Sequence, residues 1–374
     1  MNRRRLCYVV ASGMTVTAFL REHIRAAAQH YDVTVIADAP VDAFPGLPAR
    51  LIPVPIPRRI APFGDLRALL LLIAIFRRER FDLVHSVTPK AGLLASLAGV
   101  IAGVPLRTHT FTGQVWATRR GAGRALLKML DRMTAALATR VLADSASQRE
   151  FLIAEGVVAA DRIRVLGKGS VNGVDAARFR PDPGARERVR ARALIPTGAV
   201  LFLYLGRLSR DKGLLDLARA FAAVEDAWLM VVGPDEDGLA GEIRAAGGAA
   251  AARLCILGAT TEPEQYMSAA DVFVLPSHRE GFGSVILEAA AAGIPAIGTR
   301  IYGVTDAIVE GKTGLLVSVG DIVALAASMR QLAGDAPLRE ALGRAARERA
   351  LRDFRTEDLT RALLAYYGEL PGNA

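Results

Sequence analysis

The sequence predicts an α/β protein made of two doubly wound domains, each built on a parallel sheet. Short apolar runs rich in β-branched residues alternate with helical segments along all 374 residues. This alternation is typical of parallel sheets with helices on both faces. The chain is too long for one ordinary hydrophobic core and suits two. The expected strands are also too many for one sheet, so we expect two Rossmann-like domains that face one another across a cleft.

The expected strands are the apolar runs of four to six residues bounded by turn signals, with a few shorter ones. In the first half they are Leu6–Ala11, Val33–Ala37, Arg50–Val54, Leu83–His85, Leu106–Thr110, Val141–Ala143 and Ile163–Val165. In the second half they are Val200–Leu205, Trp228–Val232, Leu254–Leu257, Val272–Leu275, Ala296–Thr299 and Gly314–Val317.

A stretch rich in loop signals separates the two sets of strands. Residues 171–197 contain three prolines, and we expect them to form an interdomain linker. The first domain then covers residues 1–170 and the second covers residues 198–355. The final segment, 356–370, is helical with an aromatic end, and we expect it to pack back on the first domain.

Three segments mimic membrane or export signals. Residues 68–76 and 91–106 are apolar, but a bilayer span needs roughly 20 residues, so we interpret both as helices that cover a sheet. Arginines at both ends of the 68–76 segment also suit a helix lying on a bilayer surface. The arginines at positions 3–5 precede an apolar run like that of a secretion signal. We interpret this run as a first strand, because YDVTVIAD after the next helix indicates a second one.

Positive charge is concentrated in the first half. Residues 1–175 carry 24 Lys and Arg against 13 Asp and Glu, and the remaining residues carry 23 against 25. A basic half suits an anionic surface, such as inner-leaflet phospholipid or a lipid pyrophosphate. An ordinary solvated face in an arginine-rich protein gives the same count. Few aromatic residues lie among the arginines and no nucleic-acid-binding motif is present, so we expect no nucleic-acid partner.

The cysteines indicate a reducing compartment. Cys7 and Cys255 lie in expected strands of different halves, which is typical of two buried, reduced thiols. The cysteines therefore indicate a cytoplasmic protein. Together with the basic first half, they lead us to expect peripheral association with the inner face of the plasma membrane.

The most informative segment is HREGFGSVILEAAAAGIPAIGT, which follows an expected strand. Glu280 precedes two glycines, Gly281 and Gly283, and Ser284 opens a short helix that carries Glu288. A glycine turn between strand and helix leaves backbone N–H groups at a helix N-terminus, where an anion binds favourably. Carboxylates accept the paired hydrogen bonds that sugar hydroxyls donate. The segment is thus typical of a nucleotide-sugar site, with one Glu on the hexose and the other on the ribose.

A second motif opens the second domain. A strand runs into Gly206 and Arg207, and Lys212 and Gly213 follow four residues later, ahead of an amphipathic helix. Two cations on one short loop at the carboxyl end of a strand suit a diphosphate. Alone, they are equally typical of solvated loop charges. Beside the Glu pair, one ligand explains both motifs.

The first domain offers weaker candidates. Gly13 lies in a strand-to-helix turn, where it either approaches a ligand or makes a simple tight connection. His85 lies at the end of an expected strand, and Lys90 lies at the start of the next helix. Both are candidates for contacting the acceptor, the molecule to which a sugar would be transferred. His109 and Thr112 begin the polar segment after another strand. Their alternative roles are a core histidine and a turn residue.

The acidic run GPDEDG, residues 233–238, suggests a metal site. It lies on a turn after a strand, and Arg207 and Lys212 already suffice to neutralise a diphosphate. The sequence also lacks zinc-ligand spacing and a GxSxG elbow. We therefore expect no metal and no cofactor.

Together these motifs resemble those of retaining, GT-B-fold glycosyltransferases of family 4, over nearly the whole chain. EGFGSVILE and the GR-x4-KG motif carry most of the resemblance. VNGVDAARF is similar to the family's interdomain NGVD segment, and VLADSASQREFL to its SxS helix entry. GSVNGVD and FTGQVW are most similar to bacterial members that extend undecaprenyl-diphosphate-linked oligosaccharides for capsule, O-antigen or protein glycosylation.

The resemblance implies transfer of a hexose or N-acetylhexosamine from a nucleotide diphosphate sugar to a hydroxyl of a polyprenyl-diphosphate-linked saccharide. The resemblance to the family favours UDP over GDP as the nucleotide of the donor. The implied donor contacts are Arg207 and Lys212 on the diphosphate, Glu280 with the backbone of Gly281, Phe282 and Gly283 on the sugar, and Glu288 on the ribose. Thr112 stands where many members have a histidine near the transferred sugar, and His109 is a nearby substitute.

Two other functions stay open on the sequence. A nucleotide-sugar 2-epimerase has the same two-domain fold, but it needs acid and base groups near the sugar C2. The first domain has no paired His or carboxylate motif for that role. The second is a non-catalytic subunit that binds a sugar nucleotide. The intact set of Arg207, Lys212, Glu280 and Glu288 favours an enzyme.

Overall fold

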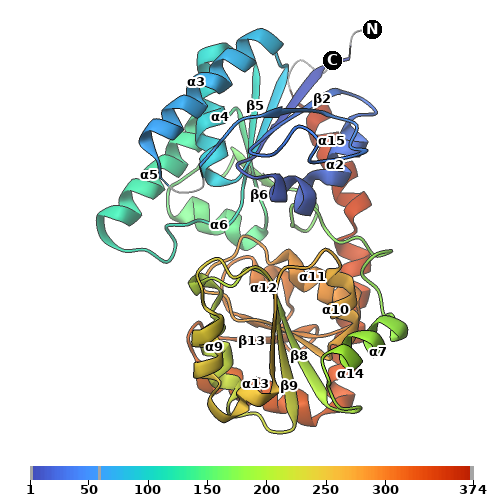
Figure 1. Ribbon diagram of the computed structural model, residues 1–374. Coiled ribbons are helices and arrows are strands. Elements are labelled where there is room, and N and C mark those ends of the chain that lie inside the picture. The colour runs from blue at the N-terminus through green and yellow to red at the C-terminus, as the bar shows by residue number, and fades with distance from the viewer. Residues whose placement is uncertain (1–2, 58–59, 371–374) are drawn as a thin grey trace. The chain divides into compact units, whose positions relative to one another are not determined.

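The computed structural model describes residues 3–57 and 60–370. They form two compact units (Figure 1). Unit 1 is the chain up to Asn172 together with the residues from Thr356 onward, and unit 2 is Gly173–Arg355. The chain therefore leaves unit 1 after its seventh strand and returns to it with the last helix.

Among the described residues, unit 1 contains a seven-stranded parallel sheet in the order β3-β2-β1-β4-β5-β6-β7. Its strands are β1 (Arg5–Val9), β2 (Asp32–Ala37), β3 (Arg50–Pro53), β4 (Leu83–Val87), β5 (Leu106–Phe111), β6 (Arg140–Ala143) and β7 (Ile163–Val165). The order of the strands reverses between β1 and β4, so the sheet is doubly wound.

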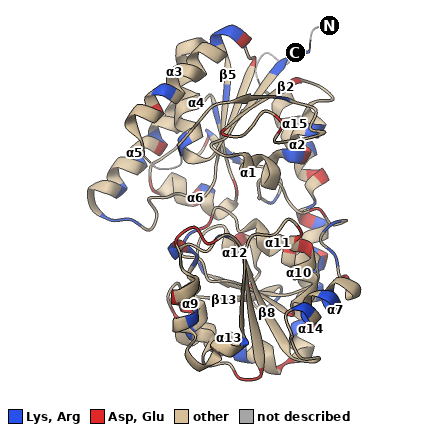
Figure 2. Cartoon of the chain, in the orientation of Figure 1, with Lys and Arg blue, Asp and Glu red and all other residues tan. Residues whose placement is uncertain are grey.

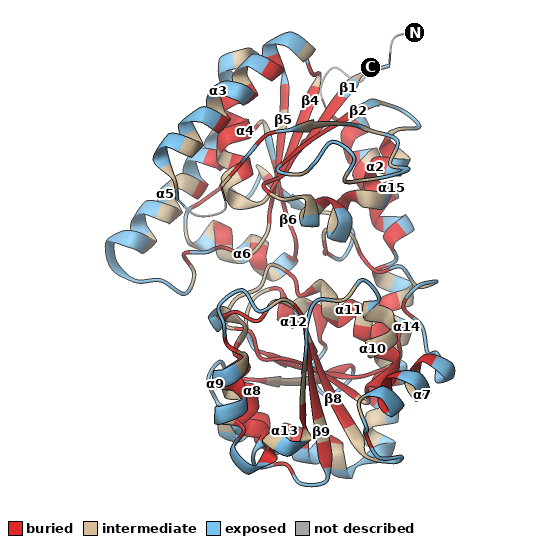
Figure 3. Cartoon of the chain, viewed as in Figure 1, coloured by how far each residue is buried: buried red, intermediate tan, exposed pale blue. Residues whose placement is uncertain are grey.

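Helices cover both faces of this sheet (Figure 1). They are α1 (Gly13–Thr15), the π-helical η1 (Val16–Leu20), α2 (Arg21–Ala27), α3 (Pro62–Glu79), α4 (Pro89–Ala102), α5 (Gly121–Leu137), α6 (Ala146–Ala154) and α15 (Thr356–Gly368). Apolar side chains of α3 and α4 pack on one face, and those of α2 and α15 pack on the other. Figure 3 shows the strands of this sheet largely buried and the outer sides of α3 and α5 exposed.

The C-terminal helix α15 is part of the core of unit 1. Its Leu363, Tyr366 and Tyr367 are buried beside the strands. The Tyr367 hydroxyl donates a hydrogen bond to the hydroxyl of Tyr8 on β1 at 3.1 Å. His23 of α2 is hydrogen-bonded through Nδ1 to Thr360 at 2.8 Å. These polar contacts fix the position of the helix on the sheet.

Unit 2, all of which the structure describes, contains a six-stranded parallel sheet in the order β10-β9-β8-β11-β12-β13. The strands are β8 (Val200–Leu205), β9 (Ala227–Val232), β10 (Leu254–Leu257), β11 (Val272–Leu275), β12 (Ala296–Thr299) and β13 (Gly314–Val317). The helices are α7 (Pro183–Arg192), η2 (Arg210–Lys212), α8 (Leu214–Phe221), α9 (Ala240–Ala246), η3 (Gly248–Arg253), α10 (Pro263–Ala269), α11 (Ser284–Ala291), α12 (Val304–Ala307), α13 (Ile322–Gly334) and α14 (Ala336–Asp353).

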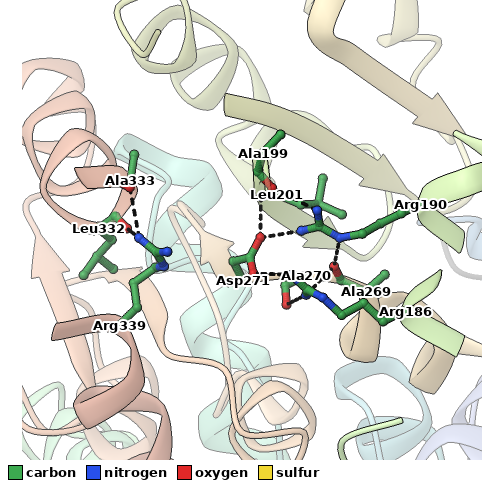
Figure 4. Close-up of polar contacts among 10 residues, drawn as sticks. All are labelled: Arg186, Arg190, Ala199, Leu201, Ala269, Ala270, Asp271, Leu332, Ala333 and Arg339. Atoms are coloured by element: carbon green, nitrogen blue, oxygen red, sulfur yellow. Dashed lines mark hydrogen bonds and ion pairs between the residues drawn. The ribbon is translucent and has the colours of Figure 1, made fainter. Parts of the chain in front are cut away.

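The segment predicted as a linker belongs to unit 2 from Gly173 onward. Pro183 lies in the first turn of α7, where its fixed φ and missing N–H favour a helix start. Arg186 and Arg190 of α7 bind the two oxygens of Asp271 at 2.7 and 2.5 Å (Figure 4). Asp271 also accepts the N–H of Leu201 on β8. Residues 173–197 therefore form part of a packed domain, which differs from the prediction.

Every predicted strand is present, with ends that differ by two residues at most. The prediction of a parallel, doubly wound α/β fold is confirmed. No helix among the described residues is long and apolar enough to cross a membrane. Cys7 and Cys255 carry free thiols, and burial raises the pKa of the Cys7 thiol.

Candidate functional site

The predicted site residues of unit 2 follow β8 and β11, the neighbouring strands at which the order of the sheet reverses. Backbone pairing between these strands joins Val272 to Phe202 and Phe273 to Leu203. Both strands continue for two residues beyond the second pair. Ligands of doubly wound sheets bind outside the carboxyl ends of the strands at this position.

The loop after β8 is held against the loop after β9 by two glycines. Gly206 donates its N–H to the Val232 carbonyl at 2.9 Å. A β-carbon on Gly233 would lie 1.9 Å from the Gly206 carbonyl oxygen, so only glycine fits there. This approach brings Arg207 to the acidic run that follows β9, and Arg207 Nη1 lies 2.7 Å from Oε2 of Glu236.

Each acid of the GPDEDG run has a partner within unit 2. Glu236 pairs with Arg207, and Asp235 accepts backbone N–H groups at the start of α9. Asp237 accepts the N–H of Arg210 at 3.1 Å. Across the described residues, no group of three or more His, Cys, Asp or Glu side chains lies close enough to hold a metal ion.

Lys212 and Glu280, which the sequence places on separate loops, form an ion pair. Lys212 Nζ lies 2.6 Å from Glu280 Oε1, and each side chain is only 14% exposed. The Ser277 hydroxyl donates to the same carboxylate oxygen at 2.7 Å. Gly213, with φ of 67°, allows the two loops to approach, because a β-carbon there would lie 2.1 Å from the Pro276 carbonyl oxygen.

Further polar contacts hold these two loops together, and the sequence analysis did not predict them. Asp211 accepts hydrogen bonds from Arg279 and Ser209, each at 2.6 Å. Burial opposes ionisation of Asp211, but these donors and nearby cations hold its pKa below the usual value. Nε2 of His278 lies 3.0 Å from Asp216 on α8. The polar run before Glu280 was the only sequence signal for this network.

The glycine turn before α11 has the geometry that the sequence predicts. Gly283 is the N-cap residue with φ of 76°, a conformation that favours glycine. The Phe282 side chain is buried, with its ring centroid 5.5 Å from that of Phe354. A β-carbon on Gly303 would lie 2.1 Å from the Gly281 carbonyl oxygen. The N-terminus of α11, at Ser284, is therefore fixed four residues after Glu280.

Glu288 lies in the second turn of α11, and the structure records no hydrogen bond or ion pair of its carboxylate with any described residue. Burial raises its pKa to about 7, and the charge of Arg178 opposes this shift. Arg178 is held by Glu264 at 2.8 Å and by the Thr261 carbonyl at 2.9 Å. Arg178 belongs to VNGVDAARF, but the sequence analysis did not single it out.

The two histidines proposed for the acceptor side are core residues of unit 1. His85 Nε2 lies 2.7 Å from the Thr110 hydroxyl, and its Nδ1 is hydrogen-bonded to Tyr367. His109 is hydrogen-bonded to Ser86 at 3.0 Å. Burial lowers the pKa of each imidazole to about 3. Both are 2% exposed or less, because β4 and β5 continue beyond them, and in this structure neither is open to a ligand.

The remaining candidates of unit 1 lie nearer its surface. Lys90 Nζ pairs with Asp65 of α3 at 2.8 Å. The Thr112 carbonyl accepts hydrogen bonds from Gln114 and Gln148, each at 2.7 Å. Gly13 begins α1, and a β-carbon there would meet Ala39 at 3.0 Å. Packing against Ala39 therefore supports the second role considered for Gly13, a tight connection between strand and helix.

Comparison with known proteins identifies the family. The family described as "Glycosyl transferases group 1" matches residues 185–349, and "Glycosyl transferase 4-like domain" matches residues 13–169. The capsular polysaccharide biosynthesis glycosyltransferase CapM of Staphylococcus aureus is 32% identical, over 84% of this chain and 83% of CapM. The chain belongs to the family 4 glycosyltransferases. The prediction that it is an enzyme of this class is confirmed.

Other relatives of this glycosyltransferase include the Escherichia coli UDP-Gal:alpha-D-GlcNAc-diphosphoundecaprenol alpha-1,3-galactosyltransferase. It is 29% identical over 71% of this chain and 70% of its own. Sucrose-phosphate synthase from Thermosynechococcus elongatus aligns over both full chains with a TM-score of 0.82 and 23% identity. Anabaena HepE, solved with UDP and glucose, aligns over 98% of this chain and 100% of its own, with a TM-score of 0.82 and 18% identity. These structures confirm the GT-B fold class.

Proposed function

We propose that this glycosyltransferase moves a hexose or N-acetylhexosamine from a UDP-sugar to a hydroxyl of a polyprenyl-diphosphate-linked saccharide, with retention of the anomeric configuration. The observation that carries the proposal is the Lys212–Glu280 ion pair at the carboxyl ends of β8 and β11. It brings a phosphate-binding cation and a hydroxyl-binding carboxylate into contact beside the N-terminus of α11.

Binding of the donor exchanges partners within this pair. The diphosphate takes Lys212 from Glu280, and the released carboxylate accepts hydrogen bonds from the sugar hydroxyls. Gly281 to Ser284 lie between Glu280 and the first turn of α11, where backbone N–H groups and the helix dipole favour negative charge. Lys212 and Glu280 thus each keep a hydrogen-bond partner in both states.

Arg207 and Glu288 complete the proposed donor site. Arg207 moves from Glu236 to the diphosphate, since a phosphate offers the guanidinium two charged oxygens. Glu288 accepts the ribose hydroxyls, which supplies hydrogen bonds to its unpaired carboxylate. Arg207 and Lys212 together neutralise the diphosphate, so we propose that the reaction needs no metal.

In the reaction, the bond between the anomeric carbon and the diphosphate oxygen breaks, and a bond from the acceptor oxygen to the same carbon forms. Arg207, Lys212 and the amides before α11 stabilise the charge that develops on the leaving oxygens. The acceptor proton passes to the leaving diphosphate oxygen as attack occurs on the same face of the sugar. This route requires no imidazole base, which agrees with the burial of His85 and His109 and with the low pKa, about 3, that burial gives each imidazole.

The names of the relatives support the choice of substrates. CapM is named for capsular polysaccharide biosynthesis. The Escherichia coli relative is named for a UDP-galactose donor and a diphosphoundecaprenol-linked acceptor, and the HepE structure holds UDP and glucose. A polyprenyl-linked acceptor places the protein at the inner face of the plasma membrane, where the positive charge of residues 1–175 suits anionic lipid.

The test is transfer by the purified full chain in the presence of EDTA. Radiolabelled UDP-glucose, UDP-galactose, UDP-N-acetylglucosamine and the corresponding GDP-sugar panel are each supplied with an undecaprenyl-diphosphate-linked saccharide. We expect labelled lipid from one UDP-sugar, and an H1–H2 coupling constant in the product that matches the donor anomer. Donor-only reactions control for hydrolysis and for epimerisation of the sugar.

Four results count against parts of the proposal. Transfer from GDP-sugars alone contradicts the nucleotide, and an inverted anomer contradicts retention. Transfer to a water-soluble saccharide with none to the polyprenyl-linked acceptor contradicts the acceptor class. Loss of activity in EDTA that Mg²⁺ restores contradicts the metal-free diphosphate site.

A further inference from the structure

The outer surface of the helical layer formed by α3, α4 and α5 is unusually apolar for solvent-exposed helices. On α3, Phe63 is 91% exposed, and Leu66 and Leu70 are more than half exposed. On α5, Leu126, Met129 and Met133 are between 40% and 49% exposed. Single exposed apolar residues are ordinary, whereas a contiguous set indicates an interaction surface.

These residues point away from the sheet by helical geometry. On α3, the buried side chains are Ala68, Leu72, Ile75 and Phe76, and positions 63, 66 and 70 fall on the opposite side of the helix. On α5, the buried side chains are Asp131, Thr134 and Ala135, and positions 126, 129 and 133 likewise fall opposite. Figure 3 shows exposed residues along the outer sides of both helices.

Helix α4 lies beside both of the others and continues the same surface. Lys90 at its start pairs with Asp65 near the start of α3, so the two helices begin side by side. Its Leu93 and Leu97 are partly exposed, and Val100 is 44% exposed. These positions also lie opposite its buried residues. We call the set Phe63, Leu66, Leu70, Leu93, Leu97, Val100, Leu126, Met129 and Met133 the outer apolar face.

The segment that carries the outer apolar face, residues 60–137, exposes cations and no acids. Residues 60–137 contain 11 Lys and Arg against four Asp and Glu. The exposed cations are Arg67, Arg77, Arg78, Arg80, Arg119, Arg120 and Arg132. None of the four acids of this segment is exposed. Asp65 pairs with Lys90, Glu79 with Arg50 and Arg78, and Asp131 accepts the Trp116 N–H. Figure 2 shows the blue segments on α3 and α5.

We infer that the outer apolar face is the surface by which unit 1 binds an anionic phospholipid bilayer. Apolar side chains at its centre enter the boundary between headgroups and acyl chains, and the surrounding arginines contact lipid phosphates. This arrangement is that of an interfacial helix and not of a membrane span, in agreement with the finding that no described helix is long and apolar enough to cross a membrane.

A second copy of the chain would fit the outer apolar face less well than an anionic bilayer does. A two-fold symmetric contact would place the same face on both protomers, so the arginines around one face would meet those of the other without any exposed acid of residues 60–137 to pair with. Like charges in such a contact oppose association. An anionic bilayer supplies the complementary charge, and its binding does not depend on the transfer reaction.

The test is co-sedimentation of the full chain with vesicles. One set contains phosphatidylglycerol and phosphatidylethanolamine, and the other contains phosphatidylcholine alone. We expect binding to the anionic vesicles that weakens as NaCl rises, and at least about tenfold weaker binding to phosphatidylcholine. The double variant Leu70→Glu/Met129→Glu should lose binding, and Arg67→Glu/Arg77→Glu should bind only at lower salt.

Val323→Glu is the matched control, because Val323 is 77% exposed on α13 of unit 2. It should bind vesicles as the unaltered protein does. Thermal unfolding followed by circular dichroism checks that each variant folds. A second measurement labels Leu66→Cys with an environment-sensitive fluorophore, and wild-type protein treated in the same way is the blank. We expect a blue shift of the label with anionic vesicles.

Three outcomes overturn the inference. The first is unchanged vesicle binding by the folded Leu70→Glu/Met129→Glu variant. The second is equal loss of binding by Val323→Glu. The third is a lipid-free dimer in analytical ultracentrifugation that the double variant dissociates, since the face would then join two copies of the chain.

Discussion

The α-carbon of Gly213 lies so close to the carbonyl oxygen of Pro276 that a β-carbon on residue 213 would be 2.1 Å from it. The turn after β8 therefore rests directly on the loop after β11. Lys212 and Glu280 meet because of this backbone contact, one residue before Gly213 and four residues after Pro276.

Gly213→Ala should separate the two loops and lower stability by about 3 kcal/mol, the sum of a left-handed conformation and a steric overlap. Donor affinity should fall with it. Gly311→Ala is the control, since Gly311 has φ of 69° and a β-carbon there would meet nothing within 4 Å. It should cost about 1 kcal/mol. Urea unfolding measures both, and equal losses would contradict the role of the Pro276 contact.

Lys212→Ala and Glu280→Ala should each lower kcat by at least about 10²-fold, the scale of lost electrostatic stabilisation of a leaving group. In our proposal Lys212 stabilises the diphosphate and Glu280 positions the sugar. Lys312→Ala, which removes an exposed lysine of the same unit, should leave kcat unchanged. Steady-state transfer rates measure the effect. Near-normal rates for both site variants would contradict the assignment of Lys212 and Glu280 to the donor site.

Glu288 predicts opposite pH dependences for donor binding and for stability. Its folded-state pKa, about 7, is raised above the ordinary value by burial. The folded protein therefore keeps a proton that the unfolded chain loses, and stability should fall as pH rises from about 4.5 to about 7. Donor affinity should rise over the upper part of this range, because the ionised carboxylate is the better acceptor for ribose hydroxyls.

Glu288→Gln should flatten both profiles. Urea unfolding without donor and calorimetric titration with UDP, each from pH 4.5 to 8, measure them. A UDP affinity that depends on pH equally in the variant and in the unaltered protein would exclude Glu288 as the titrating group.

Asp271→Ala should destabilise unit 2 by about 3 kcal/mol, because it leaves Arg190 without its carboxylate partner in a largely buried position. Arg186→Ala should cost less, since Arg190 still holds Asp271 and the Arg186 side chain is 38% exposed. Arg339→Ala is a control for the loss of arginine contacts to backbone, because Arg339 binds carbonyls at the end of α13 (Figure 4). Thermal unfolding gives the order, and a larger loss for Arg186→Ala than for Asp271→Ala would contradict it.

The strands were predictable because most are short, mainly apolar runs bounded by turn signals. Their ends were less predictable, and this had a consequence for function. His85 lies at the end of the predicted strand, but β4 continues to Val87, so the side chain is a core residue. The signals for α7 were hidden because its helix sets two arginines, the partly exposed Arg186 and the buried Arg190, against one acid that lies far away in sequence.

The site was predictable as a set of residues and not as a set of contacts. GR-x4-KG and the Glu pair identify the two loops by residue type. The pairing of Lys212 with Glu280 depends on the approach of Gly213 to Pro276, which no spacing encodes. The acidic run after β9 was interpreted only as a false metal signal, whereas its Glu236 is the partner of Arg207.

The return of α15 to unit 1 has a consequence for synthesis of the protein on the ribosome. Unit 2 is complete once Arg355 has been made, but the sheet of unit 1 waits for Tyr366 and Tyr367 to cover one of its faces. The half that leaves the exit tunnel first is therefore the last to finish folding. A premature stop codon just before α15 would damage the half of the nascent chain made earliest, while leaving the later half whole.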